Sequence, residues 1–80
     1  MDENKLMELM DIAENRFAGH GYQFDDVRWG KNAFAFDVYD EDAGMFDAAI
    51  GTFYFWYDPD DVFERTAEQQ LEDKLNEWEI

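Results

Sequence analysis

The hydrophobic residues of this chain change their spacing along its length, and that change limits the folds open to it. Residues 33–39 (AFAFDVY) direct Phe34, Phe36 and Val38 to one side, which is the period of two of a β-strand. Residues 3–18 instead repeat apolar side chains every three or four positions, which predicts a helix with one apolar face. A chain with both periods needs a mixed fold, so an α+β class is expected. The apolar face of the first helix comprises Leu6, Leu9, Met10, Ala13 and Phe17.

Two further strands are predicted around the alternating segment. Residues 22–29 read as the first strand, and the Asp-Asp pair at 25–26 interrupts its alternation and predicts a β-bulge. The sequence Gly-Lys-Asn at 30–32 is typical of a short hairpin turn. A polar loop at 40–47 leads to the most hydrophobic strand, at 48–57. Because short connections join neighbouring strands, an antiparallel meander is expected.

The acidic sequence DPDD at 58–61 predicts the start of a second helix. Asp58 can cap a helix, Pro59 suits its first turn, and further acids favour the positive end of the helix dipole. The helix is expected to run from residue 59 to about 78. The prediction is thus one α+β domain spanning 1–80, in the order α-β-β-β-α, with a three-stranded antiparallel meander sheet packed with two helices. The apolar face of the second helix comprises Phe63, Ala67, Leu71, Leu75 and Trp78.

Charge is the strongest guide to function. The chain has 21 Asp and Glu against six Lys and Arg, a formal net charge of -15. So much charge of one sign destabilises a compact fold, disfavours direct binding of nucleic acid, and predicts a partner with a strongly basic surface. Acids recur at i,i+4 spacing on the predicted second helix, although such pairs repel one another. The residues predicted to contact the partner on this helix are Asp60, Asp61, Glu64, Glu68, Glu72 and Asp73. The predicted contacts in the polar loop at 40–47 are Asp40, Glu41 and Asp42. An acidic helix face that is merely solvated is the alternative.

Aromatic residues form a second candidate surface. If Phe53 and Phe55 pack in the core, Ile50, Thr52, Tyr54 and Trp56 lie on the other face of the last strand. One helix on each face of the sheet would cover them, whereas an open face would expose an aromatic patch rimmed by acids. Trp and Tyr are typical interface anchors, so Tyr54 and Trp56 are predicted partner contacts if exposed. Trp29 and Tyr39 are candidates for the same side.

The residue types that catalysis requires are scarce. The chain has no Cys and no Ser, and its single histidine, His20, is expected to be a loop or helix-cap residue. Residues 40–51 resemble a calcium loop only superficially, because Gly51 stands where the bidentate acid would be needed. We therefore expect no enzyme activity, no cofactor and no metal site. The acidic N-terminus and the lack of a long apolar run predict a soluble cytoplasmic protein that does not enter a membrane.

In size, charge density and its acidic second helix, the chain resembles the small acidic DNA-mimic proteins of phages and mobile elements, including anti-CRISPR and anti-restriction proteins. The resemblance implies an inhibitor that blocks the basic DNA- or RNA-binding surface of a host defence complex, such as a CRISPR effector complex. An immunity or antitoxin-type inhibitor of a basic nuclease, and a generic acidic interaction domain, are the alternatives. The sequence is compatible with a monomer or a homodimer.

Overall fold

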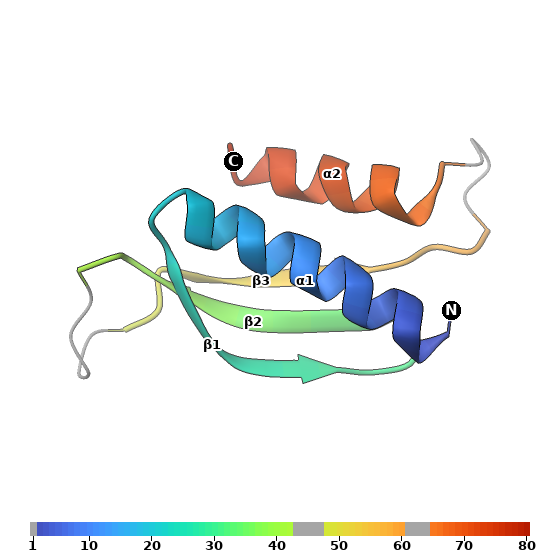
Figure 1. Cartoon of the computed structure of the whole chain (residues 1–80), viewed down its shortest axis with the longest axis horizontal. Helices are drawn as coiled ribbons and strands as arrows, with labels where there is room; N and C mark the ends of the chain where they lie inside the picture. Colours follow the sequence, from blue (N-terminus) through green and yellow to red (C-terminus); the bar gives the residue numbers. More distant parts are fainter. Residues whose placement is uncertain (1, 43–47, 61–64) are drawn as a thin grey trace.

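The computed structural model of the protein describes residues 2–42, 48–60 and 65–80. The elements follow the order α-β-β-β-α, and the strands form one sheet in the order β1-β2-β3 with antiparallel neighbours (Figure 1). The α+β class and the meander topology predicted from the sequence are confirmed. The elements are α1 (Glu3–Gly19), β1 (Gln23–Trp29), β2 (Ala33–Tyr39), β3 (Gly51–Trp56) and α2 (Ala67–Glu77).

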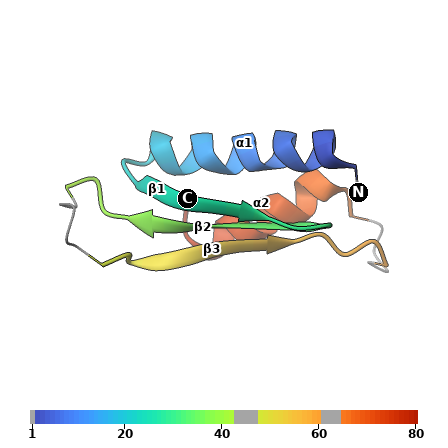
Figure 2. The same ribbon diagram turned by 90° about the horizontal axis from the view of Figure 1, so that it is seen from below.

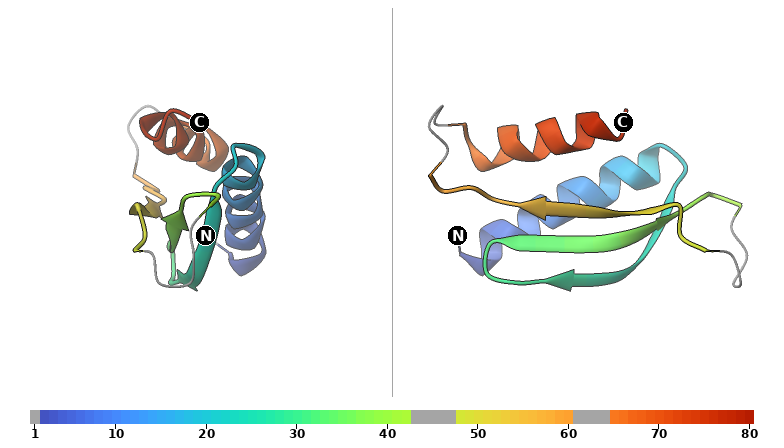
Figure 3. Two further views of the ribbon diagram at one scale, coloured as in Figure 1. Left: turned by 90° about the vertical axis from the view of Figure 1, so that its left-hand side faces the viewer. Right: turned by 180° about the vertical axis from the view of Figure 1, so that it is seen from behind.

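Both helices lie on the same face of the sheet. Seen end-on, the strands form one layer, and α1 and α2 lie side by side in the other (Figure 3, left). The view from below shows α1 running along one side of the strands (Figure 2). The alternative with one helix on each face is therefore wrong for the described residues, and the opposite face of the sheet carries no described helix.

The hydrophobic core fills the space between the helices and this face. Phe17 of α1 lies at its centre, with ring centroids 5.4 Å from Phe36, 5.2 Å from Phe53 and 5.3 Å from Trp78, all edge to face. Such aromatic pairs add about 0.5–1.5 kcal/mol each beyond the area they bury. The predicted apolar faces are confirmed, except that Phe63 lies outside the described residues. The core comprises Leu6, Leu9, Met10, Ala13, Phe17, Phe34, Phe36, Val38, Phe53, Phe55, Leu71 and Leu75.

The first helix and the bulge follow the sequence prediction closely. The Asp2 side chain caps α1 by accepting a hydrogen bond from the Lys5 N–H, and His20 is the C-cap residue. Gly21 follows with φ 84°, the left-handed conformation that glycine adopts without strain. In β1 the register shifts between Asp25 and Arg28, which confirms the predicted bulge.

The second helix begins later than predicted. It starts at Ala67 rather than at residue 59, because Thr66 and Gln69 form a reciprocal capping box: each side chain accepts the other's backbone N–H. Asp58 does not cap this helix; its side chain accepts the Asp60 N–H at 2.9 Å in a turn. The pattern Thr-x-x-Gln at 66–69 is the competing start signal in the sequence.

The third strand is shorter than predicted, spanning Gly51–Trp56 rather than 48–57. Hydrogen bonds from Ile50 N–H to Val38 O and from Tyr57 N–H to Asn32 O continue the pairing at either end. Gly51, at the start of β3, packs closely against the Trp78 ring. A Cβ at this position would lie 2.9 Å from Cη2 of Trp78.

Candidate partner-binding surface

The outer edge of β3 is the first part of the candidate surface. Tyr57 donates its N–H to Asn32 beyond the end of β2, at 2.8 Å. Because residues of an antiparallel strand alternate in the edge they face, Thr52, Tyr54 and Trp56 direct their N–H and C=O groups away from β2. None of these three residues has another backbone partner within the described residues. The edge strand therefore presents free peptide groups.

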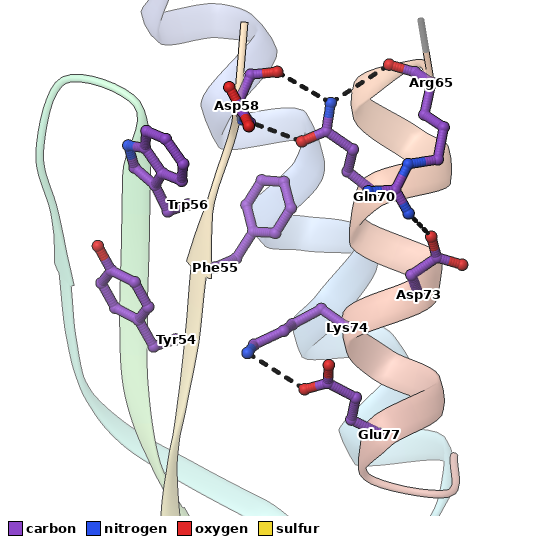
Figure 4. A pocket seen from close by; sticks show the side chains of 9 residues that line it. All are labelled: Tyr54, Phe55, Trp56, Asp58, Arg65, Gln70, Asp73, Lys74 and Glu77. Atoms are coloured by element: carbon purple, nitrogen blue, oxygen red, sulfur yellow. Dashed lines mark hydrogen bonds and ion pairs between the residues drawn. The ribbon is translucent and has the colours of Figure 1, made fainter. Parts of the chain in front are cut away.

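A shallow groove of about 400 Å³ runs between this edge and α2. Phe55 points across it toward the helix, whereas Tyr54 and Trp56 lie on the other side of β3 (Figure 4). On the helix side, Lys74 and Glu77 form an ion pair of 3.2 Å. The groove is lined by Tyr54, Phe55, Trp56, Asp58, Arg65, Gln70, Asp73, Lys74 and Glu77.

Gln70 closes one end of the groove. The residue is only 8% exposed, which is unusual for a polar residue on an acidic helix. The amide oxygen accepts the Asp58 N–H at 2.9 Å, and the amide nitrogen donates to Asp58 O at 3.1 Å and to Arg65 O at 3.2 Å. The Gln70 amide thus pairs with Asp58 as a peptide group of a neighbouring strand would (Figure 4).

The predicted acids on α2 are present, but they are not free. Glu68 pairs with Lys5, Glu72 with Arg16 at 2.9 Å, and Asp73 with Arg65. The first two pairs join α2 to α1, and Arg16 also donates to the backbone oxygen of Ile80 at 3.1 Å. The carboxylates remain about half exposed. They therefore connect the two helices as well as facing solvent.

The other predicted acids do not extend this row. Asp60 lies in the turn after β3 rather than on the helix, so the expected i,i+4 row from 60 to 72 is wrong at its first member. Asp61 and Glu64 lie outside the described residues. The three residues Asp40–Asp42 follow the end of β2, whereas Asp60 follows the end of β3, and the antiparallel register places these two ends at opposite ends of the sheet. The courses of the two strands can be followed in Figure 1.

The Asp40–Asp42 segment is held against the start of β1. The Gln23 side chain donates to Glu41 O at 2.6 Å, and the Asp42 N–H donates to the Asp40 side chain at 3.5 Å. A Cβ on Gly21 would lie 2.9 Å from the Glu41 carboxylate. None of the three carboxylates forms an ion pair with a described residue. Their charge therefore faces solvent uncompensated.

Tyr54 and Trp56 are exposed, as the aromatic-patch hypothesis requires. They are 52% and 53% accessible, on the face of the sheet that no described helix covers. Trp29 is exposed too, but it lies opposite Phe34 in the register and so projects from the helix side of β1. The expectation that Trp29 joins Tyr54 is therefore wrong, because the bulge changes the alternation along β1.

One carboxyl on α1 is electrostatically unfavourable where it stands. Partial burial, and then the neighbouring charge of Asp11, raise the pKa of Glu14 above its ordinary value. The helix therefore tolerates this carboxylate at some cost in stability.

Among the described residues, no group of three acidic or histidine side chains converges in a way that suits a metal ion, and no helix is long and apolar enough to cross a membrane.

The sequence analysis did not identify the open edge of β3 or the buried Gln70 as parts of the candidate surface. The buried amide leaves no trace in the hydrophobic pattern, because position 70 lies beside Leu71 in an otherwise polar run.

No family model matches the chain, and no curated protein or solved structure was found to be similar to it. The chain's own residues therefore carry the functional argument.

Proposed function

We propose that this protein is a non-enzymatic inhibitor that occupies the basic nucleic-acid-binding surface of another protein. A nucleic-acid-binding complex of a host defence system, such as a CRISPR effector complex, is the proposed partner. Nucleic acid itself is not a ligand, because phosphates would be repelled by a chain of net charge -15.

The supporting observation is the way in which the few basic residues are used. Lys5, Arg16, Arg28, Arg65 and Lys74 are all engaged in ion pairs with acids of the chain. Lys31 is the one base without such a pair among the residues that the structure describes. Several described acids have no base within ion-pair distance, among them Asp40, Glu41 and Asp42 after β2 and Asp60 after β3. A surface of this kind attracts a basic surface over distances comparable to the Debye length.

The paired acids of α2 also support the proposal. Exposed ion pairs are worth only about 0–1 kcal/mol, so an arginine of a partner can displace Lys5 from Glu68 or Arg16 from Glu72 at small cost. The bases of the chain thereby hold α2 and α1 together in the free protein, and a basic partner can take over the carboxylates on binding.

The test is capture from the host lysate followed by competition. The tagged protein is expected to retain a nucleic-acid-binding protein, and nucleic acid is expected to displace it. Added salt should weaken the complex, since long-range attraction contributes to association. Simultaneous binding of the protein and nucleic acid to the captured partner would contradict blockade of a shared surface.

The variants should spare the ion pairs, because a variant that removes one changes a contact of the free protein as well as a contact with the partner. The triple variant Asp40→Asn, Glu41→Gln, Asp42→Asn removes three unpaired charges from one end of the molecule. The matched control Glu3→Gln, Asp11→Asn, Glu79→Gln removes three charges elsewhere and changes the net charge equally. Weaker binding by the first variant alone would locate the contact, whereas an equal loss would indicate attraction by net charge only. Captured partners that are immune to both variants and bind no nucleic acid would contradict the proposal.

A further inference from the structure

The two edges of the sheet differ in a way that bears on recognition. Natural proteins protect edge strands with bulges, charges or proline. The β1 edge has such protection, because its register shifts between Asp25 and Arg28 and Asp26 has φ 55°. The β3 edge has none between Thr52 and Trp56, where the pairing with β2 is regular.

The peptide groups of the β3 edge indicate what this edge can bind. Thr52, Tyr54 and Trp56 direct their peptide groups outward, and Asp58 is the next residue with the same alternation. At Asp58 both groups are taken by the Gln70 amide, at 2.9 and 3.1 Å. The chain thus satisfies the end of this edge with a substitute for a neighbouring strand and leaves the three preceding peptide units free within the described residues.

We propose that the β3 edge accepts an extended segment of a basic protein partner, which adds a fourth strand to the sheet beside the groove. The inference rests on the proposed function, because it identifies how the basic partner is engaged. Backbone pairing at an exposed sheet edge provides affinity, and alternate side chains provide selectivity.

Side chains on both faces of an added strand favour arginine or lysine. Those on the helix side would meet Asp73 and Glu77, which line the groove together with their ion-pair partners Arg65 and Lys74. Both carboxylates are more than half exposed, so an incoming base can share them or displace the partner at small cost. Those on the open side would meet the exposed rings of Tyr54 and Trp56, over which a cation is attracted by the ring quadrupole. Basic residues therefore suit either register of the incoming strand.

Charge disfavours the other natural occupant, which is β3 of a second copy. Edge-to-edge pairing of two chains would bring together two bodies of net charge -15. Their mutual repulsion opposes association at low salt, whereas a basic segment is attracted.

The experiment uses a peptide of about eight residues, a usual strand length, in which arginine alternates with valine. Binding to the full chain is followed by NMR and amide hydrogen exchange. The expected signature alternates along β3: exchange slows at Thr52, Tyr54 and Trp56, whose N–H groups face outward, and changes little at Phe53 and Phe55, which already pair with β2. A control peptide with proline in place of valine keeps the charge but cannot form a regular strand, so it should bind more weakly.

Two variants separate the backbone from the ring. Tyr54→Ala keeps the outward N–H, whereas Tyr54→Pro removes it. The proline variant is expected to bind the peptide about tenfold more weakly than the alanine variant, which corresponds to about 1.4 kcal/mol, the scale of one hydrogen bond. Because proline can also perturb the strand, the exchange pattern of the unmodified chain is an independent readout.

The following results would overturn the inference. Peptide binding without slowed exchange at the outward amides, or equal binding of the proline peptide, would indicate charge attraction alone. Slowed exchange at these amides before peptide is added, together with a doubled mass, would assign the edge to a second copy. If the edge binds the peptide but the captured partner binds no nucleic acid, the proposed function fails and the edge site stands. If the captured partner binds nucleic acid but the edge does not bind the peptide, the edge site fails and the proposed function stands.

Discussion

Replacement of Gln70 by leucine should destabilise the protein far more than its place on a polar helix suggests. The side chain makes three hydrogen bonds to the backbone of Asp58 and Arg65, and the residue as a whole is 8% exposed. Leucine fills a similar volume but leaves one N–H and two C=O groups without their partner. Asp58 would lose both of its backbone hydrogen bonds to the helix.

The expected loss is about 2 kcal/mol. Each hydrogen bond contributes about 0.5–1.5 kcal/mol net, and some of the freed groups lie close enough to solvent to regain water. For a domain of this size, the corresponding drop in melting temperature is roughly 8–16 °C. Gln70→Glu should be worse at neutral pH, because its carboxylate retains the Asp58 N–H but faces the Asp58 and Arg65 carbonyl oxygens without a donor.

The measurement is urea unfolding followed by tryptophan fluorescence, with hydrogen exchange at the Asp58 amide as a local readout. Asn76→Ala, an exposed position on the same helix, is the matched control and should stay within about 0.5 kcal/mol of the unmodified chain. A Gln70→Leu variant that matched this control would refute the reasoning that the buried amide anchors the segment. The Gln70→Glu variant should regain stability as the pH falls, because its protonated form can again donate a hydrogen bond.

Three further substitutions test the packing, the electrostatics and the helix cap. Gly51→Ala should cost about 1–3 kcal/mol in thermal or urea unfolding, because the new Cβ would meet the Trp78 ring at 2.9 Å; a neutral result would contradict the close packing. Glu14→Gln should be more stable than the unmodified chain at pH 7, since burial and Asp11 raise the pKa of the folded carboxyl. The folded state then holds this proton more tightly than the unfolded state, so the cost is present at neutral pH and is relieved as the pH falls toward the ordinary value of 4.5; a difference between the two chains that did not narrow on acidification would oppose this reading. Thr66→Ala should lose about 0.5–2 kcal/mol and fray the first turn of α2 by circular dichroism, and a start of the helix unchanged by this variant would argue against the capping box.

The prediction of the fold succeeded where local spacing was decisive. The stripe from Leu6 to Phe17 and the alternation at 33–39 required a helix and a strand, and both are present. The start of α2 was misjudged because DPDD at 58–61 and Thr-x-x-Gln at 66–69 are both start signals. Local chemistry alone does not rank them, whereas the hydrogen bonds of Gln70 with Asp58 favour the later one.

The candidate surface shows the same division between local and long-range information. Acids and aromatic residues are visible in the sequence, and the exposure of Tyr54 and Trp56 agrees with one of its two alternatives. The ion pairs of Glu68 and Glu72 with Lys5 and Arg16 join residues far apart in the chain, so no local pattern could predict them.

The sequence alone determined the identity and order of the elements, because side-chain periodicity and turn residues act over a few positions. It also determined the excess of negative charge, which does not depend on the fold. Only the tertiary structure decided that both helices cover one face of the sheet, that every basic residue but Lys31 forms an ion pair within the described residues, and that the β3 edge remains open. These properties depend on contacts between segments that are distant in the sequence. The packing of the apolar faces of the helices and the sheet determines which of these contacts form.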